Sequence, residues 1–412
     1  MPENHLTNFV CVRCQANHPP DIDSGICPAC GGNLDARYDY PAIAKEISLK
    51  RLKDDPGRSI WRYAPFLPTR LSQSPCPLPV GLTPLTEAPR LGERLGLKNL
   101  LVKNDSLNPS GSFKDRASLM VLAHCMETGQ AHICAASTGN AGTSMACMAA
   151  AAGRRATIFV PASAPRAKIA QLAIFGARLF LVEGDYRSAF ELCRDVSRRM
   201  GWFNRNTGTT PYTREGKKTV AFEIWEQMNG VCPDAVVVPV GDGNIISGAY
   251  KGFFDLQQAG MIGKIPRIIG VQAEHSAAIA AAFHGDGVIR RVAAKTVADS
   301  ISAAFPSDGE AAMAAARNSG GTFVTVSDEK ILAGMKALAA TEGIFAEPSG
   351  AAGVAGIQAL LDQGSLHPDD WVALIVTGSG LKDIDAVFSV TAVPEPVPPD
   401  PDSIIALLKE DA

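Results

Sequence analysis

Lys114 stands where a helix is predicted to begin, a position that favours chemistry at its amine. The preceding loop, residues 104–113, is rich in Asn, Pro, Ser and Gly, and residues 114–127 have a helical pattern. A lysine near a helix N-terminus faces the positive end of the helix dipole, which favours the neutral amine. Schiff-base chemistry requires that neutral form. The alternative is an ordinary exposed helix lysine.

Three further polar turns each follow a predicted strand. Residues 137–143 read Ser-Thr-Gly-Asn-Ala-Gly-Thr, residues 239–245 read Pro-Val-Gly-Asp-Gly-Asn-Ile, and residues 377–383 read Thr-Gly-Ser-Gly-Leu-Lys-Asp. Backbone N–H groups at a helix start bind anions, so the first turn suits a carboxylate and the second a phosphate. A hydroxyl on the third could meet a ring nitrogen or an anion. Each turn alone could equally be a plain connection, and the second lacks the Gly-x-Gly-x-x-Gly pattern of dinucleotide sites.

Four of the ten cysteines fall within the first thirty residues in the pattern C-x2-C-x12-C-x2-C, as Cys11, Cys14, Cys27 and Cys30. Four thiolates at this spacing can close a tetrahedral zinc site. Because no coordination position stays open, we expect the zinc to be structural rather than catalytic. The alternative is a ribbon that has lost its metal and packs as a small hairpin. The other six cysteines have no partner spacing and are predicted to be buried apolar residues.

The elements that must position these groups alternate regularly from residue 100 onward. Strands are predicted at 100–103, 133–136, 156–160, 178–182, 235–240, 267–272 and 371–376. Helices are predicted at 114–127, 141–152, 166–175, 188–200, 219–228, 245–259, 328–341 and 349–361. This alternation predicts an α/β fold of parallel sheets covered on both faces. Ligands bind such sheets at the carboxyl ends of the strands, where the polar turns fall.

Less regular segments flank this alternation. Residues 65–84 are Pro-rich and predicted to be irregular, without a helix. The segment 391–401 contains five prolines and is predicted to be an extended arm before a short terminal helix.

The composition narrows the class of protein. With 46% hydrophobic residues the 412-residue chain can build full cores, and its net charge of −3 gives no basic field for nucleic acid or an anionic membrane. No apolar run reaches 18 residues and the first thirty residues do not resemble a signal peptide, so we expect no membrane association and a cytoplasmic protein with reduced thiols.

The order of these motifs resembles the pyridoxal-phosphate (PLP) enzymes of fold type II, the group of the tryptophan synthase β subunit, and within it the threonine synthase family. The resemblance covers roughly residues 80 to 385 and lies in five motifs, Gly-Leu-Thr-Pro-Leu at 81–85, Gly-Ser-Phe-Lys-Asp-Arg at 111–116, Glu-Gly-Lys-Lys-Thr at 215–219, Glu-Pro-Ser-Gly-Ala at 347–351 and Gly-Leu-Lys-Asp at 380–383. The cysteine ribbon is similar to one that precedes this domain in some members and their paralogues.

The resemblance implies a role for each candidate residue. Lys114 would bind PLP covalently, Asn140 would hydrogen-bond its 3′-oxygen and Thr377 would face its ring nitrogen. The cofactor phosphate would be held by the turn Gly241, Asp242, Gly243 and Asn244. The substrate carboxylate would be held by Ser137, Thr138 and Gly139. A side chain at Gly243 should displace the phosphate without unfolding the sheet, and we expect the Asp242 carboxylate to point outward, away from a dianion.

Two positions depart from the family pattern around the substrate's phosphate. Residue 141 is Ala where a Thr is usual, and the next hydroxyl is that of Thr143. Arg214 precedes Glu215 where the family offers an arginine, but in an uncertain register. We expect Thr143 and Arg214 to contribute to substrate binding.

The implied reaction is that of a carbon–oxygen lyase acting on phosphates, which converts O-phospho-L-homoserine and water to L-threonine and phosphate. The rivals are a paralogue acting at Cβ, such as a serine or threonine dehydratase or a β-replacement enzyme using phosphoserine, and a zinc-ribbon interaction protein with an inactive enzyme domain. The expected partners are a small amino-acid substrate and a second copy of the chain in a homodimer.

The chain is predicted to divide into four parts. Residues 1–37 form the zinc ribbon-like segment, and residues 38–107 with 213–390 form the large PLP-binding α/β domain. Residues 108–212 form a smaller α/β domain, and residues 391–412 form the Pro-rich arm.

Overall fold

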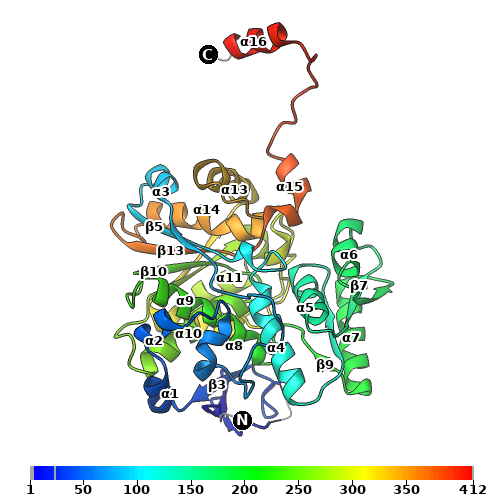
Figure 1. The fold of residues 1–412 in the computed structure, drawn as a ribbon, viewed down its shortest axis with the longest axis vertical. Coiled ribbons are helices and arrows are strands. Elements are labelled where there is room, and N and C mark those ends of the chain that lie inside the picture. The colour runs from blue at the N-terminus through cyan, green and yellow to red at the C-terminus, as the bar shows by residue number, and fades with distance from the viewer. Residues whose placement is uncertain (1–3, 23–24, 411–412) are drawn as a thin grey trace.

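Two mainly parallel sheets lie in separate regions of the computed structural model, which describes residues 4–22 and 25–410 (Figure 1). The larger sheet has six strands in the order β12-β11-β10-β13-β5-β4. Its strands are β4 Leu85–Glu87, β5 Asn99–Asn104, β10 Ala235–Pro239, β11 Arg267–Ala273, β12 Phe323–Val326 and β13 Trp371–Val376. All its pairs are parallel except β4 with β5. Every residue of β10 is buried, as a central parallel strand requires.

The second sheet has four parallel strands in the order β8-β7-β6-β9. They are β6 Ile133–Ala136, β7 Ala156–Pro161, β8 Arg178–Val182 and β9 Phe203–Asn204. The predicted division places the six-stranded sheet within residues 38–107 and 213–390, and this sheet within 108–212. The division itself remains a prediction.

The described residues form sixteen α-helices, and most of them cover the sheets or flank them. They are α1 Tyr40–Glu46, α2 Leu49–Asp54, α3 Pro89–Leu95, α4 Lys114–Glu127, α5 Asn140–Ala151, α6 Arg166–Ala173, α7 Tyr186–Met200, α8 Tyr212–Lys217, α9 Thr219–Gln227, α10 Asn244–Gln258, α11 Ala278–His284, α12 Gly309–Ser319, α13 Asp328–Glu342, α14 Pro348–Asp362, α15 Ile384–Phe388 and α16 Pro401–Glu410. None of them is both long and apolar enough to cross a membrane.

Small residues set how closely helices approach the sheets. In α14, a Cβ atom added at Gly353 would lie 2.3 Å from Leu374 Cδ1, and one at Gly356 would lie 2.3 Å from Val271 Cγ2. Larger side chains here would force the helix away from β13 and β11. The glycine and alanine content of residues 348–362 is therefore a packing requirement.

The N-terminal ribbon is a three-stranded antiparallel sheet made of β1 Leu6–Cys11, β2 Asn17–His18 and β3 Leu34–Tyr38. At the other end of the chain, residues 391–400 run away from the body to α16 (Figure 1). The predicted extended arm and terminal helix are confirmed.

The predicted α/β fold is confirmed, but several elements differ from the prediction. The edge strand β4 runs antiparallel to β5, although only parallel sheets were expected. Residues Ile60–Phe66 form a 3-10 helix that extends into the segment predicted to be irregular. Strands β4, β9 and β12 were not predicted, and neither were the helices α1, α2, α3, α8, α11, α12 and α15.

Candidate active site

Two adjoining cavities collect most of the predicted site residues. The first, here called the lysine cavity, is lined by Lys114, Lys217, Thr377 and the turn 239–246. The second, the carboxylate cavity, is lined by Thr138, Gly139, Asn140, Glu347 and Lys382, among others. Ser300 lines both cavities, and its Oγ accepts a hydrogen bond from Asn140 Nδ2 at 3.1 Å. The turns after β6, β10 and β13 thus open onto one cleft.

Lys114 is the first residue of α4, as predicted. Its Nζ atom has no hydrogen-bond or ion-pair partner within residues 4–22 and 25–410. Burial lowers the pKa of Lys114; Arg205 adds to this effect, whereas Glu347 and Asp242 oppose it. The amine therefore has a larger neutral fraction than an exposed lysine. Burial, rather than the helix dipole on which the sequence argument rested, is the main cause.

The turn after β10 presents backbone donors without acceptors. In the described chain, the N–H groups of Gly241, Asp242 and Gly243 make no hydrogen bond, and the turn leads into α10, whose N-terminus adds partial positive charge. Lys217 Nζ donates to Asn244 Oδ1 at 2.5 Å, which places a buried amine beside the turn. Burial lowers the pKa of Lys217 well below its ordinary value, and the neighbouring Lys114 and Arg205 add to this effect. Asp242 is exposed and accepts hydrogen bonds from Ser307 N and Oγ at 3.3 and 3.2 Å. These groups fit a phosphate.

Gly243 also packs against α12. Its φ is +90°, and an added Cβ would lie 2.7 Å from the carbonyl oxygen of Asp308 and 2.9 Å from Ala312 Cβ. A side chain here would therefore collide with the start of α12, and its expected effect on the cofactor phosphate stays a prediction.

The turn after β6 also carries hydrogen-bond donors that have no acceptor among the described residues. Gly139 is the N-cap of α5, and no hydrogen-bond partner lies near the hydroxyls of Ser137 and Thr138 in the part of the chain that the structure describes. Thr143, in the first turn of α5, is 3% exposed and lines neither cavity. The turn therefore has the donors to bind a carboxylate.

Thr377 and Asn140 face the cleft from opposite sheets. The hydroxyl of Thr377, at the end of β13, has no partner among the described residues, whereas its carbonyl accepts from Phe113 N at 2.9 Å. Asn140 Nδ2 also donates to Glu347 Oε1 at 2.8 Å. Burial raises the pKa of Glu347, and the nearby Lys114 and Lys382 oppose this only in part.

Arg214 does not line either cavity. Its guanidinium is buried, ion-paired with Asp308, and donates to Asp35 Oδ1 and the Leu34 carbonyl, each at 3.3 Å. Burial opposes its charged form, but Asp308 and Asp35 outweigh this and raise the pKa of Arg214. Its substrate-binding role remains a prediction from the sequence, and the structure shows it engaged elsewhere.

The buried basic side chains divide into two groups. Five form ion pairs with carboxylates: Lys103, Arg116, Arg214, Lys218 and Lys251. Arg205 and Lys217 form no ion pair with any described residue, although each is only 2% exposed.

Arg205 Nη2 lies 3.3 Å from Ser118 Oγ, one helical turn beyond Lys114 on α4, and its Nε has no partner. Burial lowers the pKa of Arg205 to about 10. Two buried basic groups beside Lys114 thus lack a counter-charge, which a bound anion would supply.

The sequence argument assigned no role to Glu347, Lys217, Ser300 or Arg205. Glu347 and Lys217 lie in motifs that carried the family resemblance, and those motifs could have indicated them. Ser300 and Arg205 lie outside any motif, and only the fold brings them to the cleft.

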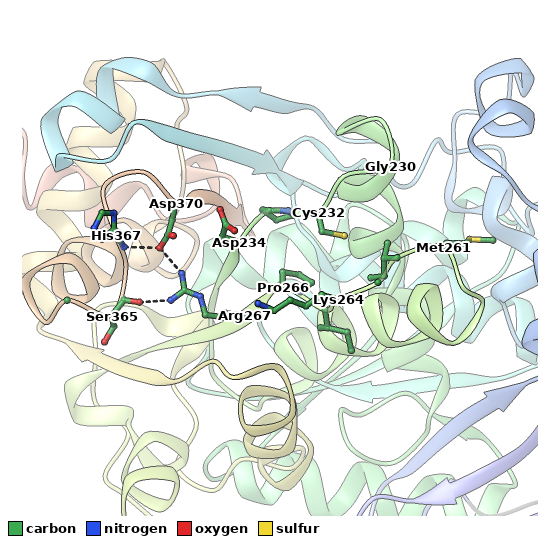
Figure 2. A pocket seen from close by; sticks show the side chains of 15 residues that line it. Gly230, Cys232, Asp234, Met261, Lys264, Pro266, Arg267, Ser365, His367 and Asp370 are labelled. Atoms are coloured by element: carbon green, nitrogen blue, oxygen red, sulfur yellow. Dashed lines mark hydrogen bonds and ion pairs between the residues drawn. The ribbon is translucent and has the colours of Figure 1, made fainter.

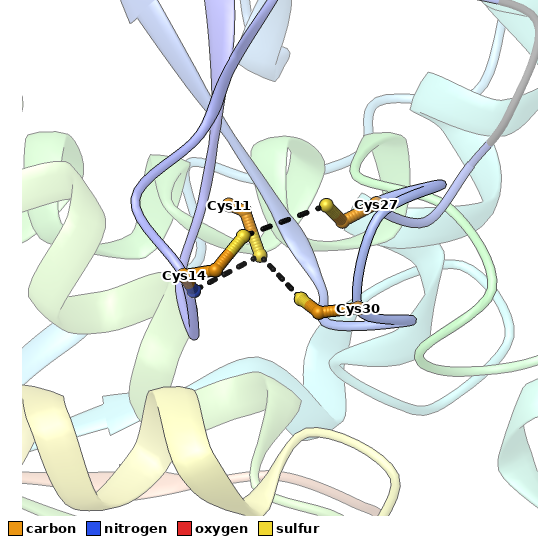
Figure 3. A group of neighbouring side chains, drawn as sticks. All are labelled: Cys11, Cys14, Cys27 and Cys30. Carbon is orange, nitrogen blue, oxygen red and sulfur yellow. Dashed lines mark hydrogen bonds between the residues drawn. The ribbon is translucent and has the colours of Figure 1, made fainter.

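The four N-terminal cysteines converge, with their Sγ atoms all within 4.8 Å of one another (Figure 3). The Cys11–Cys30 and Cys14–Cys27 sulfur pairs are 3.4 and 3.7 Å apart, close to the edge of a tetrahedron with Zn–S bonds of about 2.3 Å. Burial opposes ionisation of the Cys27 thiol, but the backbone N–H groups of Cys30 and Ala29 lower its pKa to about 6. The thiols fit a structural zinc ion.

A further pocket lies at the opposite edge of the six-stranded sheet, where β10, β11 and β13 begin (Figure 2). Arg267 Nη2 pairs with Asp370 Oδ2 at 2.6 Å, and His367 N donates to the same oxygen at 2.8 Å. This pocket contains none of the residues predicted from the sequence.

Comparison with known proteins agrees with this geometry. Residues 77–378 match the family described as pyridoxal-phosphate dependent enzyme. Threonine synthase of Methanocaldococcus jannaschii is 34% identical over 404 residues, which are 97% of this chain and 99% of that protein. Threonine synthase of Methanosarcina acetivorans is 36% identical over 275 residues, or 66% of each chain.

Solved structures share the fold. The processed threonine deaminase isoform 2 of Solanum lycopersicum superposes with a TM-score of 0.64 at 24% identity, covering 75% of this chain and 87% of that one. Maize serine racemase gives 0.65 at 23% identity, covering 80% and 93%. The family match and the near-complete alignment with a curated relative decide the assignment: the chain belongs to the pyridoxal-phosphate-dependent enzymes and, within them, to the threonine synthase family.

Proposed function

We propose that this protein is a threonine synthase, a lyase that converts O-phospho-L-homoserine and water to L-threonine and inorganic phosphate. The observation that carries the proposal is the pair of buried basic side chains without an ion-pair partner among the described residues, Arg205 and Lys217, beside Lys114. One cation serves the cofactor phosphate, and the second is available for a phosphate on the substrate. A dehydratase acting on serine or threonine needs only the side chain that binds the cofactor phosphate. The names of the two threonine synthases, one matched over 99% of its length, support the same activity.

The cofactor's contacts follow from the donors that remain unused. Lys114 supplies the amine that attaches PLP, and the N–H groups of residues 241–243, with Lys217, hold its phosphate. Thr377 offers a hydroxyl to the ring nitrogen, and Asn140 offers an amide to the 3′-oxygen. When bound, PLP supplies the electron sink that stabilises negative charge beside the substrate's Cα.

The chain's own groups orient the substrate and move its protons. The hydroxyls of Ser137 and Thr138, with the N–H groups at the start of α5, bind the substrate carboxylate. Arg205 binds the phosphate. The Lys114 amine, whose pKa burial lowers, would accept the substrate's Cα proton at Nζ. Neutral Thr377, in place of a carboxylate, favours elimination and replacement over transamination.

Assays with three substrates test the proposal. The purified protein should release phosphate from O-phospho-L-homoserine and form L-threonine in equal amount. Phosphate release from O-phospho-L-serine instead, or ammonia release from L-threonine, would identify one of the rival activities acting at Cβ. A protein that binds PLP but acts on none of the three would contradict the proposal.

We further propose that the protein acts in the cytoplasm as a homodimer and holds one structural zinc. The four converging thiols support the zinc, and a reducing compartment would preserve them. Metal analysis without chelator should find about one zinc per chain, because four-Cys sites bind zinc tightly. Light scattering measures the oligomeric state.

A further inference from the structure

Asp308 holds the phosphate-binding turn in place. Its fully buried carboxylate accepts hydrogen bonds from Asn244 Nδ2 at 2.7 Å and Ser247 Oγ at 2.6 Å, both in the first turn of α10. Its backbone N–H donates to the Asp242 carbonyl at 2.9 Å. One residue thus fixes both the turn and the helix start that follows it.

Arg214 connects Asp308 to the cysteine ribbon. Its Nη2 and Nε atoms bind the Asp308 carboxylate, while Nη1 reaches Asp35 and the Leu34 carbonyl on β3. Leu34 pairs in register with the metal ligand Cys11. The path from the four thiols to the phosphate turn therefore consists of packed, hydrogen-bonded groups.

A second contact joins the same two regions at the surface. Arg13 lies between the ligands Cys11 and Cys14, and its Nη1 donates to the Cys30 carbonyl at 2.7 Å. Its Nε pairs with Glu310 of α12 at 2.9 Å. Both side chains are exposed, so this pair contributes little, and the buried Arg214 carries the connection.

We propose that Arg214 and Asp308 are positioning residues through which metal binding at the ribbon strengthens cofactor binding at the turn. Zinc fixes the ribbon geometry at Leu34 and Asp35. These groups hold Arg214, which in turn holds the carboxylate that orders Asn244 and residue 242. By linkage, the cofactor must strengthen metal binding by the same factor. This inference rests on the proposed cofactor site.

The test measures PLP affinity of the full-length protein with and without zinc, by absorbance titration. Removing zinc with a chelator should weaken PLP binding by about tenfold, within the usual range of coupling between sites. Arg214→Lys keeps a charge against Asp308 but cannot also span to β3, so in this variant zinc removal should change PLP affinity less than about twofold. The matched control Arg13→Gln should keep the full zinc effect.

A reciprocal titration covers the case in which metal-free protein unfolds. Zinc affinity, measured by chelator competition, should rise with PLP by the same factor in wild type and stay constant in Arg214→Lys. If zinc does not change the PLP affinity of wild type, and PLP does not change its zinc affinity, the inference is overturned, even for an active threonine synthase. Failure to bind PLP at all would overturn the proposed function as well.

Discussion

Arg205 and Lys217 differ from the other buried basic residues of the described chain because no carboxylate neutralises them. An uncompensated buried charge costs several kcal/mol, so a fold retains one where a ligand supplies the counter-charge. Lys217 already contacts the phosphate turn through Asn244, whereas Arg205 has its Nε free. We therefore assign the two cations to two different anions.

Arg205→Gln should raise the KM for O-phospho-L-homoserine and the inhibition constant of inorganic phosphate by roughly tenfold or more, because one charge-assisted hydrogen bond is lost. The PLP absorbance should not change, and Arg205→Lys should restore part of the affinity. Arg194→Gln, an exposed arginine of α7, is the matched control. Unchanged phosphate inhibition in Arg205→Gln would remove this residue from the substrate site.

Lys114→Ala should abolish both turnover and covalent attachment of PLP, because Lys114 is the amine at the helix start that lines the cavity. Borohydride reduction of wild type, followed by peptide mapping, should place the cofactor on this residue. Lys98→Ala, an exposed lysine before β5, should retain the label. A label on any other lysine of the wild type contradicts the assignment.

Helix α12 and the phosphate turn form one packed unit. The turn can approach Asp308 and Ala312 so closely because residue 243 has no side chain and a positive φ. The ordering of the turn therefore depends on the position of a helix that follows it by more than sixty residues.

Gly243→Ala should weaken PLP binding and lower the free energy of unfolding at the same time, because the methyl group displaces α12 from the turn. The matched control is Gly320→Ala, where φ is +69° and an added Cβ meets no atom within 4 Å. The control should lose only the strain of a left-handed residue, about 1–2 kcal/mol. Urea unfolding and PLP titration measure both effects, and equal losses in the two variants would contradict the packing argument.

At the scale of the molecule, a buried ion network fixes α4 to the six-stranded sheet. Arg116 of α4 pairs with Asp105 at 2.6 Å and with Glu223, and Lys103 of β5 pairs with Glu223 at 2.6 Å. Burial opposes ionisation of Glu223, but Arg116 and Lys103 outweigh it and lower its pKa to about 2 from an ordinary value of 4.5.

This depressed pKa predicts loss of stability in acid. Because the folded pKa lies below the unfolded one, the contribution of Glu223 is fully present above about pH 4.5 and is lost as the pH falls through about 2. Glu223→Gln should cost roughly 3–5 kcal/mol at neutral pH and show a shallower decline between pH 4.5 and 2. Urea unfolding across this range, with exposed Glu93→Gln as the control, measures the slope. A slope equal to that of wild type would be evidence against the network.

The sequence by itself determined the α/β class, the main alternation of strands and helices, and the position of the polar turns. Apolar runs such as Ala235–Pro239 and the polar turns that end them are local, so periodicity and turn residues reveal them. The spacing of the four cysteines is equally local.

Only the tertiary structure decided how these parts meet. It placed Arg205 against Ser118, one helical turn from Lys114, although Arg205 lies about ninety residues from Lys114 in the sequence. It also directed Arg214 to Asp308 and the ribbon instead of the cleft. It also showed that Gly243 accommodates α12. Ion pairs and steric contacts between distant segments depend on the path of the whole chain, and no local pattern records that path.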